Sequence, residues 1–264
     1  MSQPVPTYTE QNCTFSCPLQ WGVSAFWRED AAGDDWLREL TGAVEPDGIR
    51  ILSHRLSQPT VSQFFVSSRP EVAPLSIVQR IKGRLQHLLR SSRPKAWKGN
   101  YAVRSIGKVT RETVADYIRS QIGHHEFADP RFAERLRSYQ IENPAIDLAQ
   151  PQRTSHGLYW YNLHVVMVRR DRETAWQDTE LRATREMIVA AAKAKGYLLS
   201  RAGILPDHVH LLLGCPIEES PQTIVLGYLN NLAFAVGMKA AFQFGAFVGT
   251  VGEYTNQAIT HGGE

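Results

Sequence analysis

The chain has 264 residues, of which 43% are hydrophobic, and its formal net charge is +3. This length and composition suit a globular protein with one large or two small domains. No apolar run reaches the roughly 18 residues of a membrane span, and the N-terminal residues lack the pattern of a secretory signal. We therefore expect neither a membrane-spanning nor a secreted protein. The three cysteines, an odd number, favour a reducing compartment over a disulfide framework, and we expect a cytoplasmic protein.

The first half of the chain alternates between strand and helix patterns. Its predicted strands are near residues 19–27, 49–56, 62–68 and 101–105, and its predicted helices are near 35–44 and 74–90. Thr110 is placed to cap a further helix that runs from Arg111 to Gln121. The polar stretch of about 123–155 holds three X-Pro pairs, so we expect a short helix and an extended linker there.

The second half repeats this order of elements. Its predicted strands are near residues 159–168, 197–202, 208–214 and 247–251, and its predicted helices are near 178–195 and 221–239. Each half then reads strand, helix, strand, strand, helix, strand. This order favours a ferredoxin-like α+β sandwich, in which an antiparallel sheet carries both helices on one face.

The two halves also align residue by residue, as an internal repeat does. Residues 61–78 lie over 208–225 without a gap, and 100–107 match 245–252. At the end of the second copy, Gly262 stands at the position of Tyr117. We therefore expect the last helix of the second half to be truncated.

The stretch from Val72 to Arg111 contains no acidic residue. Its basic residues are Arg80, Lys82, Arg84, Arg90, Arg93, Lys95, Lys98, Arg104, Lys108 and Arg111. A one-signed stretch of this kind favours a polyanionic partner, most simply nucleic acid, over a merely solvated surface. Trp97 and Tyr101 lie within it and could stack on unpaired bases, although both fit a core position better.

Two histidines flank one apolar residue on the predicted strand 208–214. Because side chains alternate along a strand, His208 and His210 project from the same face and could hold a divalent cation. A half-buried structural pair is the alternative. The remaining histidines fit no ligand spacing and are expected to be structural or surface residues; they include His54, His87, His124, His125, His156 and His164.

Several segments together resemble a known family, the single-tyrosine HUH transposases of the insertion-sequence 200/605 type, which include the REP-associated tyrosine transposases. In the second half the matching segments are 161–168, 206–213 and 247–252. In the first half they are 75–84, 100–107 and 117–121. The resemblance covers nearly the whole chain, once per half.

The resemblance implies a composite site, because such proteins usually carry one copy per chain and act as dimers. In them the tyrosine helix of one subunit completes the metal site of its partner, and a glutamine one turn beyond the tyrosine is the third ligand. Here Val61 and Gln63 replace the two histidines in the first half. The resemblance therefore implies one site per chain, with Tyr117 as nucleophile and with His208, His210 and Gln121 holding Mg²⁺ or Mn²⁺.

The implied protein is two tandem ferredoxin-like sandwiches that form an intramolecular pseudo-dimer: a first half at 1–125, a linker at 126–155 and a second half at 156–264. It would cut single-stranded DNA near hairpins through a 5′-phosphotyrosine intermediate and transfer the strand. It would act as a monomer, or as two cooperating chains. The expected DNA contacts are Arg80, Lys82, Arg84, Arg90, Lys98 and Arg104.

Several alternatives stay open. The chain could be a non-cleaving regulatory protein that binds hairpins or single strands, or a metallonuclease that uses water instead of a tyrosine. Tyr254 could also be a displaced nucleophile. Tyr117 itself could be a core residue of an amphipathic helix, and Gln121 a solvated one.

Overall fold

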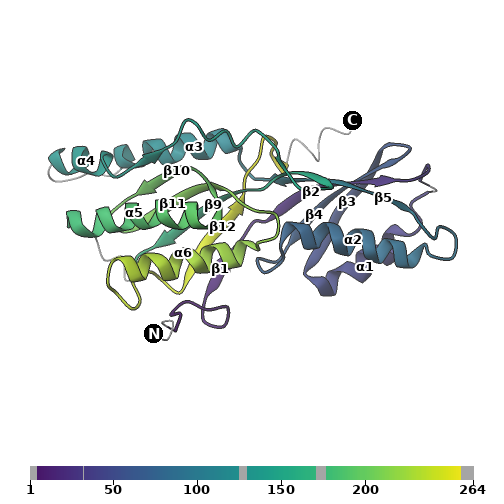
Figure 1. Ribbon diagram of the computed structural model, residues 1–264, viewed down its shortest axis with the longest axis horizontal. Coiled ribbons are helices and arrows are strands. Elements are labelled where there is room, and N and C mark those ends of the chain that lie inside the picture. The colour runs from purple at the N-terminus through teal and green to yellow at the C-terminus, as the bar shows by residue number, and fades with distance from the viewer. Residues whose placement is uncertain (1–4, 32, 125–129, 171–176, 257–264) are drawn as a thin grey trace.

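The computed structural model describes residues 5–31, 33–124, 130–170 and 177–256. Two six-stranded sheets lie side by side along the long axis of the molecule (Figure 1). Both sheets contain parallel and antiparallel pairs, so the fold is mixed α/β with two mixed sheets. Within the described ranges, no helix is long and apolar enough to cross a bilayer.

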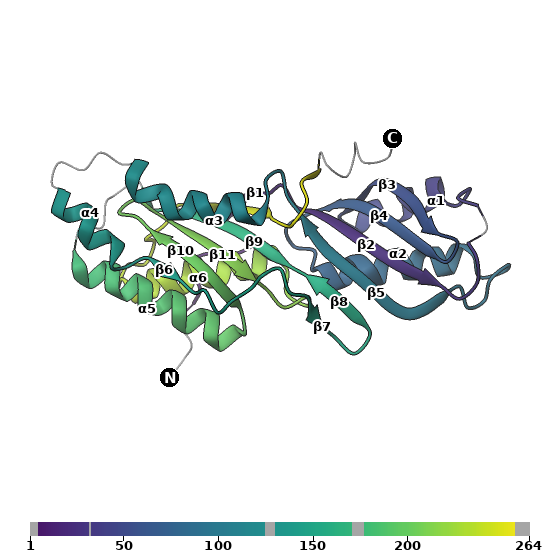
Figure 2. The ribbon, with the colours of Figure 1, turned by 90° about the horizontal axis from the view of Figure 1, so that it is seen from above.

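The first half forms a sheet with two helices on one face (Figure 2). Its elements are β2 (Gln20–Trp27), α1 (Leu37–Val44), the short 3-10 helix η1 (Glu45–Asp47), β3 (Ile49–Gln58), β4 (Val61–Ser68), α2 (Pro74–Leu88) and β5 (Trp97–Ile106). The sheet order is β3-β4-β2-β5, and it continues beyond β5. Leu40 of α1 and Ile77 of α2 share one buried core with Val23, Val66 and Val103 of the sheet.

The second half has the same arrangement. Its elements are β9 (Asn162–Val168), α5 (Asp178–Lys195), β10 (Leu198–Ile204), β11 (His208–Gly214), α6 (Pro221–Ala235) and β12 (Gly245–Thr250). Helix α6 ends before the predicted 239, because Gly237 adopts a φ of 70° and Met238 N–H donates to the Ala233 carbonyl (3.0 Å). This is a left-handed helix end that glycine permits.

The sequence repeat is also a structural repeat. When the four main strands of each half are numbered in chain order, both sheets have the inner order 4-1-3-2. The aligned residues Val61 and His208 both begin strands, and the aligned Pro74 and Pro221 both begin helices. Gly262, the expected counterpart of Tyr117, lies outside the described residues, as does His125.

The segment between the halves has regular structure of its own. It contains α4 (Pro130–Arg137), β6 (Ile141–Glu142) and β7 (Gln152–Arg153). Strand β6 pairs with β10 of the second half, whereas β7 pairs with β8 (Gly157–Trp160), which belongs to the sheet of the first half.

The two sheets exchange strands reciprocally. Strand β1 (Thr14–Ser16) pairs in parallel with β12 of the second half, and the chain then runs into β2 of the first half. In the same way, β8 pairs in parallel with β5 of the first half and leads into β9 of the second. The single strand predicted near residues 159–168 is therefore two strands, which belong to different sheets and meet at the buried Tyr161.

Two reciprocal hydrogen bonds join the ends of β5 and β12, where the chain crosses between the halves. Thr250 Oγ1 donates to the Ile106 carbonyl (2.5 Å), and Ser105 Oγ donates to the Val251 carbonyl (2.6 Å). Two glycines pass this point at close range: a Cβ on Gly107 would lie 2.6 Å from the Thr250 oxygen, and one on Gly252 would overlap the Ser105 oxygen. After Gly107 the chain enters α3 (Arg111–Ser120), which lies over the sheet of the second half (Figure 2).

Candidate active site

The paired histidines lie at the start of β11, between β9 and β10. Their ring centroids are 4.8 Å apart, and His210 is buried, with 3% of its surface exposed. His208 Nδ1 lies 2.7 Å from Asp207 Oδ1, and His210 Nδ1 lies 3.1 Å from His164 Nε2. Since the Nδ1 atoms of both rings have these partners, Nε2 is the nitrogen by which each ring would bind a metal.

His164 is a member of this site that the sequence reasoning missed. It lies on β9, the antiparallel neighbour of β11, and its ring stacks on that of His210 with an interplanar angle of 14°. Burial lowers the pKa of His164 to about 4, so its imidazole is neutral at neutral pH. The strand pattern alone could not identify it, because the parity of His164 becomes informative only once β9 and β11 are known to be neighbours.

Helix α3 brings Tyr117 from the first half to these histidines. The Tyr117 ring centroid lies 5.5 Å from that of His210 and 6.5 Å from that of His164. The phenol is accessible, because 47% of the Tyr117 surface is exposed. Tyr117 is thus an exposed side chain beside a buried imidazole, and it is not a core residue of the helix.

An apolar contact holds α3 on the sheet. Val114 and Ile118 on the buried face of the helix pack with Leu212 of β11 and with Val251 in a separate small cluster. Gly203 of β10, which is paired with His210, allows this close approach. A Cβ at Gly203 would lie 3.1 Å from Ile118 Cγ2.

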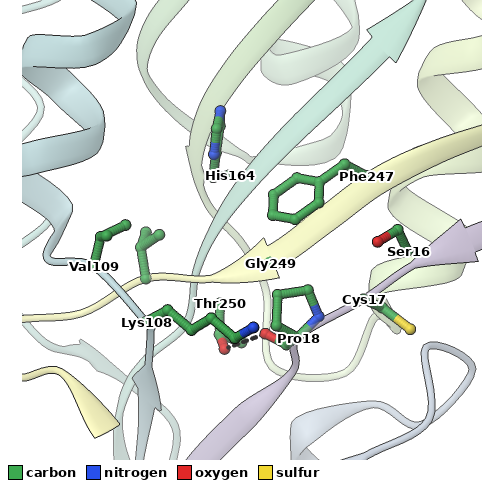
Figure 3. Close-up of a pocket in the computed structure, with 10 residues that line it drawn as sticks. Ser16, Cys17, Pro18, Lys108, Val109, His164, Phe247, Gly249 and Thr250 are labelled. Atoms are coloured by element: carbon green, nitrogen blue, oxygen red, sulfur yellow. Dashed lines mark hydrogen bonds between the residues drawn. The ribbon is translucent and has the colours of Figure 1, made fainter. Parts of the chain in front are cut away.

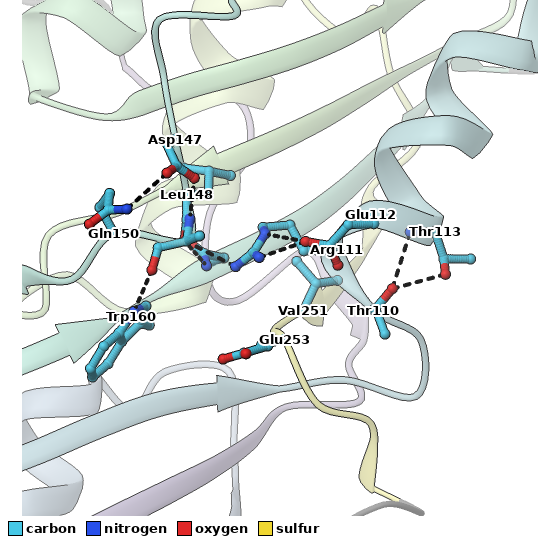
Figure 4. Close-up of polar contacts among 12 residues, drawn as sticks. Thr110, Arg111, Glu112, Thr113, Asp147, Leu148, Gln150, Trp160, Val251 and Glu253 are labelled. Atoms are coloured by element: carbon cyan, nitrogen blue, oxygen red, sulfur yellow. Dashed lines mark hydrogen bonds and ion pairs between the residues drawn. The ribbon is translucent and has the colours of Figure 1, made fainter.

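Polar contacts fix both ends of α3. Thr110 caps the helix as predicted and accepts a hydrogen bond from Thr113 N–H (3.2 Å). Arg111 donates from its backbone to the Gly252 carbonyl (2.8 Å) and from Nη1 to the Leu148 carbonyl (3.2 Å; Figure 4). At the far end, Arg119 and Arg201 both contact Glu142 of β6, at 3.4 and 2.7 Å, and tie the helix to β10.

Gln121 follows α3 directly, as the first residue of the 3-10 helix η2 (Gln121–His124). Only 5% of its surface is exposed, so it is not a solvated helix residue. It lies four positions after Tyr117, one turn along the same side of the helix. Gln121 is therefore a buried polar residue at the end of α3, one turn beyond Tyr117.

A cavity of about 410 Å³ opens beside His164 (Figure 3). Strands β1 and β12 and the connection between β5 and α3 form its walls, with Phe247 and Lys108 among the lining side chains. An ammonium group at this position could hold a phosphate of a bound strand.

The donor set fits a divalent cation that accepts imidazole nitrogen, such as Mn²⁺. His208 and His210 present two rings on one face, and Asp207 and His164 orient them. Within the described part of the chain, no group of three or more His, Cys, Asp or Glu side chains could hold a metal ion. The carboxamide oxygen of Gln121 is the candidate for a third protein ligand.

The first half lacks this set of side chains. Val61 and Gln63 occupy the positions of His208 and His210 on β4. Gly22 stands where His164 stands, since it pairs with Phe65 of β4 as His164 pairs with Leu212 of β11. Tyr254 lines the same pocket as Gly22 and Gln63, and its ring lies 5.6 Å from the Arg104 guanidinium.

Three of the predicted DNA-contacting cations lie on α2 and have partners within the protein. Arg80 and Arg84 both face Asp47 of η1, at 3.9 and 3.2 Å. Lys82 Nζ donates to three carbonyls at the start of β5, those of Lys98, Gly99 and Asn100, and burial lowers its pKa.

The other three predicted cations follow α2 in the chain. Arg90 and Lys98 are exposed, and Arg104 pairs with Glu253 at 2.9 Å. Trp97 and Tyr101 are buried, as expected of core residues, with Trp97 against Trp27 at a centroid distance of 4.1 Å.

Known proteins share features with this chain. A model of the family described as IS200-like transposases matches residues 44–121 and 158–259, which together exceed half of the chain. A search of curated proteins found no match.

Two solved structures are similar to part of the chain. A REP-associated tyrosine transposase bound to a REP hairpin is 16% identical with a TM-score of 0.32, and the match covers 38% of this chain and 61% of that one. A Deinococcus radiodurans R1 protein assigned as a transposase is 17% identical with a TM-score of 0.31, over 39% and 90%. At these scores the family model alone supports an assignment, and by that match the chain belongs to the IS200-like transposase family.

Proposed function

We propose that the chain is a metal-dependent single-stranded DNA endonuclease and strand transferase with one composite active site. The observation that carries this proposal is the position of Tyr117, which comes from the first half and lies 5.5 Å, ring to ring, from His210 of the second. In this view the halves 1–125 and 156–264, joined by 126–155, are ferredoxin-like units of a pseudo-dimer. The shared strand order and the reciprocal strand exchange support that division.

His208, His210 and Gln121 would hold Mg²⁺ or Mn²⁺. The bound ion supplies charge neutralisation at the phosphoryl oxygens, which is the chief electrostatic need in attack on a phosphodiester. Asp207 and His164 keep the two imidazoles oriented for this task. Helix α3 carries Tyr117 beside His210, and Gln121, one turn beyond Tyr117, would complete the protein ligands of the ion.

Tyr117 would act as the nucleophile. Its phenol oxygen attacks phosphorus, the bond from phosphorus to the 3′ oxygen breaks, and a 5′-phosphotyrosine link forms. The phenol loses its proton, and the departing oxygen takes one up to become a 3′-OH. Because the link keeps the reactivity of a phosphodiester, a 3′-OH can attack it in turn and rejoin a strand.

The substrate would be single-stranded DNA near a hairpin. Lys108 in the cavity beside His164 lies where the cut strand would enter. Arg90, Lys98 and Arg104 offer exposed or partly exposed charge for phosphates, and Arg80, Lys82 and Arg84 would add to it on the α2 side of the first half. Contacts of this kind give affinity that falls as salt rises.

A covalent-capture experiment tests the proposal. The protein is incubated with a labelled single-stranded hairpin library and Mn²⁺, and adducts are resolved under denaturing conditions. We expect an adduct that Tyr117→Phe abolishes and that Tyr254→Phe retains, since Tyr254 is equally exposed but lies on the other half. Cleavage that persists in Tyr117→Phe would indicate a hydrolytic nuclease, and binding without cleavage would indicate a regulatory DNA-binding protein.

A further inference from the structure

The first half carries a cavity of about 660 Å³ on the sheet face that corresponds to the active-site face of the second half. Gln63 and Gly22, the counterparts of His210 and His164, both line it. The same face of the fold therefore bears the histidines in one half and a pocket without them in the other.

Larger side chains enter this pocket at three related positions. In the first half, Arg104 of β5 pairs with Trp160 of β8. In the second half, Gly249 of β12 is the counterpart of Arg104, and Pro18 lies beside it in place of a tryptophan. Tyr254 is the counterpart of Val109 in the repeat. Two isolated β-bridges at the crossing show this equivalence: Gly107 pairs with Thr255, and Thr110 pairs with Gly252. Where the second half has small or aliphatic residues, the first has two aromatics and a guanidinium.

These groups form a stacked array at the mouth of the pocket. The Arg104 guanidinium lies 4.1 Å from the Trp160 ring centroid and 5.6 Å from that of Tyr254. Tyr254 is 47% exposed, and Trp160 is partly exposed. Aromatic and guanidinium planes that reach solvent are the groups on which unpaired bases stack in single-strand binding proteins.

The charged side chains of the pocket suit a nucleotide, which combines an anionic phosphate with a base. Arg104 and Arg55 are its cationic side chains, and Arg55 Nε donates to Gln63 Oε1 (2.9 Å). Glu253 pairs with Arg104 at 2.9 Å and opposes an incoming phosphate, although its carboxylate is 56% exposed and can move away. A guanidinium has five N–H donors, enough to serve a phosphate from within a stack.

We infer that this pocket is a second, non-catalytic site for single-stranded DNA, which holds an unpaired nucleotide by stacking on Trp160 and Tyr254 and by contact of its phosphate with Arg104. The binding stands apart from the chemistry at Tyr117. Its use rests on the proposed function: a strand cut at one half would be retained by the other while the 5′ end is covalently held.

The test uses the full chain with Tyr117→Phe, so that no strand is cut, and a fluorescent oligothymidylate without hairpins as the probe. We expect Tyr254→Ala to weaken binding by about 5- to 100-fold through the loss of one stacked base. Arg104→Gln should weaken binding by a similar factor, about 5- to 100-fold, through the loss of a charged hydrogen bond to phosphate. Arg104→Gln should also lower the salt dependence. Glu253→Gln should tighten binding, a gain that a merely structural role would not produce.

Phe234→Ala is the matched control, since Phe234 is a 74% exposed aromatic on α6 that lies outside this pocket. Trp160→Ala is a secondary variant, because Trp160 Nε1 also donates to the Ala149 carbonyl (2.8 Å) and supports the fold. Parental affinity in Arg104→Gln and Tyr254→Ala would overturn the inference. The parental chain, which keeps Tyr117, could form no covalent adduct while Arg104→Gln and Tyr254→Ala still lose affinity. In that case the catalytic proposal fails and the inference of a second binding site is kept.

Discussion

Tyr117 and His210 meet nearly edge to face, with an interplanar angle of 84°, although they belong to different halves of the chain. The crossing after Gly107 makes this contact, because it sends α3 from the sheet of one half over the sheet of the other.

Asp207 Oδ1 contacts His208 Nδ1 at 2.7 Å, which leaves Nε2 of His208 for the proposed metal ion. We expect Asp207→Asn to raise the Kd for Mn²⁺ by about 10- to 100-fold, as loss of an outer carboxylate partner does at histidine sites. Titration calorimetry measures the effect. Asp178→Asn, at an exposed position at the start of α5, is the control and should bind as the parent does. Equal affinity in Asp207→Asn would remove the case for His208 as a ligand.

Gly203 sets the distance between α3 and the sheet. The side chain in Gly203→Val would press on Ile118 and lift the helix, so we expect the yield of the covalent adduct to fall at least tenfold while the fold is kept. Gly227→Ala in α6, where a Cβ meets nothing within 4 Å, should leave the adduct unchanged. Adduct yield on a denaturing gel and thermal unfolding are read together. A Gly203→Val protein with full yield would show that the packing of α3 does not matter for the site.

Gly107 passes two backbone oxygens at the crossing. A Cβ there would lie 2.6 Å from both the Thr250 and the Val109 carbonyls, so Gly107→Ala should destabilise the chain by about 2 kcal/mol or more. Denaturant unfolding gives the value. Gly83→Ala, in open space on α2, should be neutral or stabilising by up to about 1 kcal/mol. Similar stability of the two variants would contradict the close crossing.

His54 links stability to pH. Burial lowers its pKa, so its neutral form is favoured in the folded protein. As pH falls below the unfolded value of about 6.5, the unfolded chain takes up a proton that the folded chain does not, and stability declines. We expect the loss in Tm between pH 7.5 and 5.5 to be smaller in His54→Gln than in the parent. An equal loss in both proteins would place the titrating group elsewhere.

Val61 and Gln63 occupy the positions of the two histidines. Introducing Val61→His and Gln63→His together should create a second, weaker Mn²⁺ site, since Thr60 and Gly22 stand where Asp207 and His164 support the first. Mn²⁺ stoichiometry would rise from one to two in a titration followed by electron paramagnetic resonance. A stoichiometry that stays at one would weaken the equivalence of the two strands.

Local features of the site could be predicted from the sequence. The alternation around His208 and His210 placed both rings on one face, and Thr110 correctly marked the start of α3. Strand exchange could not be predicted in this way. The apolar pattern runs on through Tyr161 without a break, and the partners of β8 and β9 are set by contacts distant in sequence.

His164 and Lys82 show the same limit for single residues. Spacing along one strand says nothing of a histidine on the neighbouring strand, so His164 could not be joined to His210 before the strand order was known. A run of basic residues likewise does not reveal which carbonyls or carboxylates fold against it. Lys82 caps backbone carbonyls, and Arg84 pairs with Asp47 from a separate segment.

Because β1 and β8 are exchanged reciprocally within one chain, the two halves cannot dissociate when the protein is diluted. An assembly of separate subunits loses its shared sites as its concentration falls, but here the phenol and the imidazoles reside in one covalent chain and each sheet borrows a strand from the other half. The proposed composite site would therefore form at a fixed ratio of one per molecule. Its turnover per chain should be the same at nanomolar and micromolar protein.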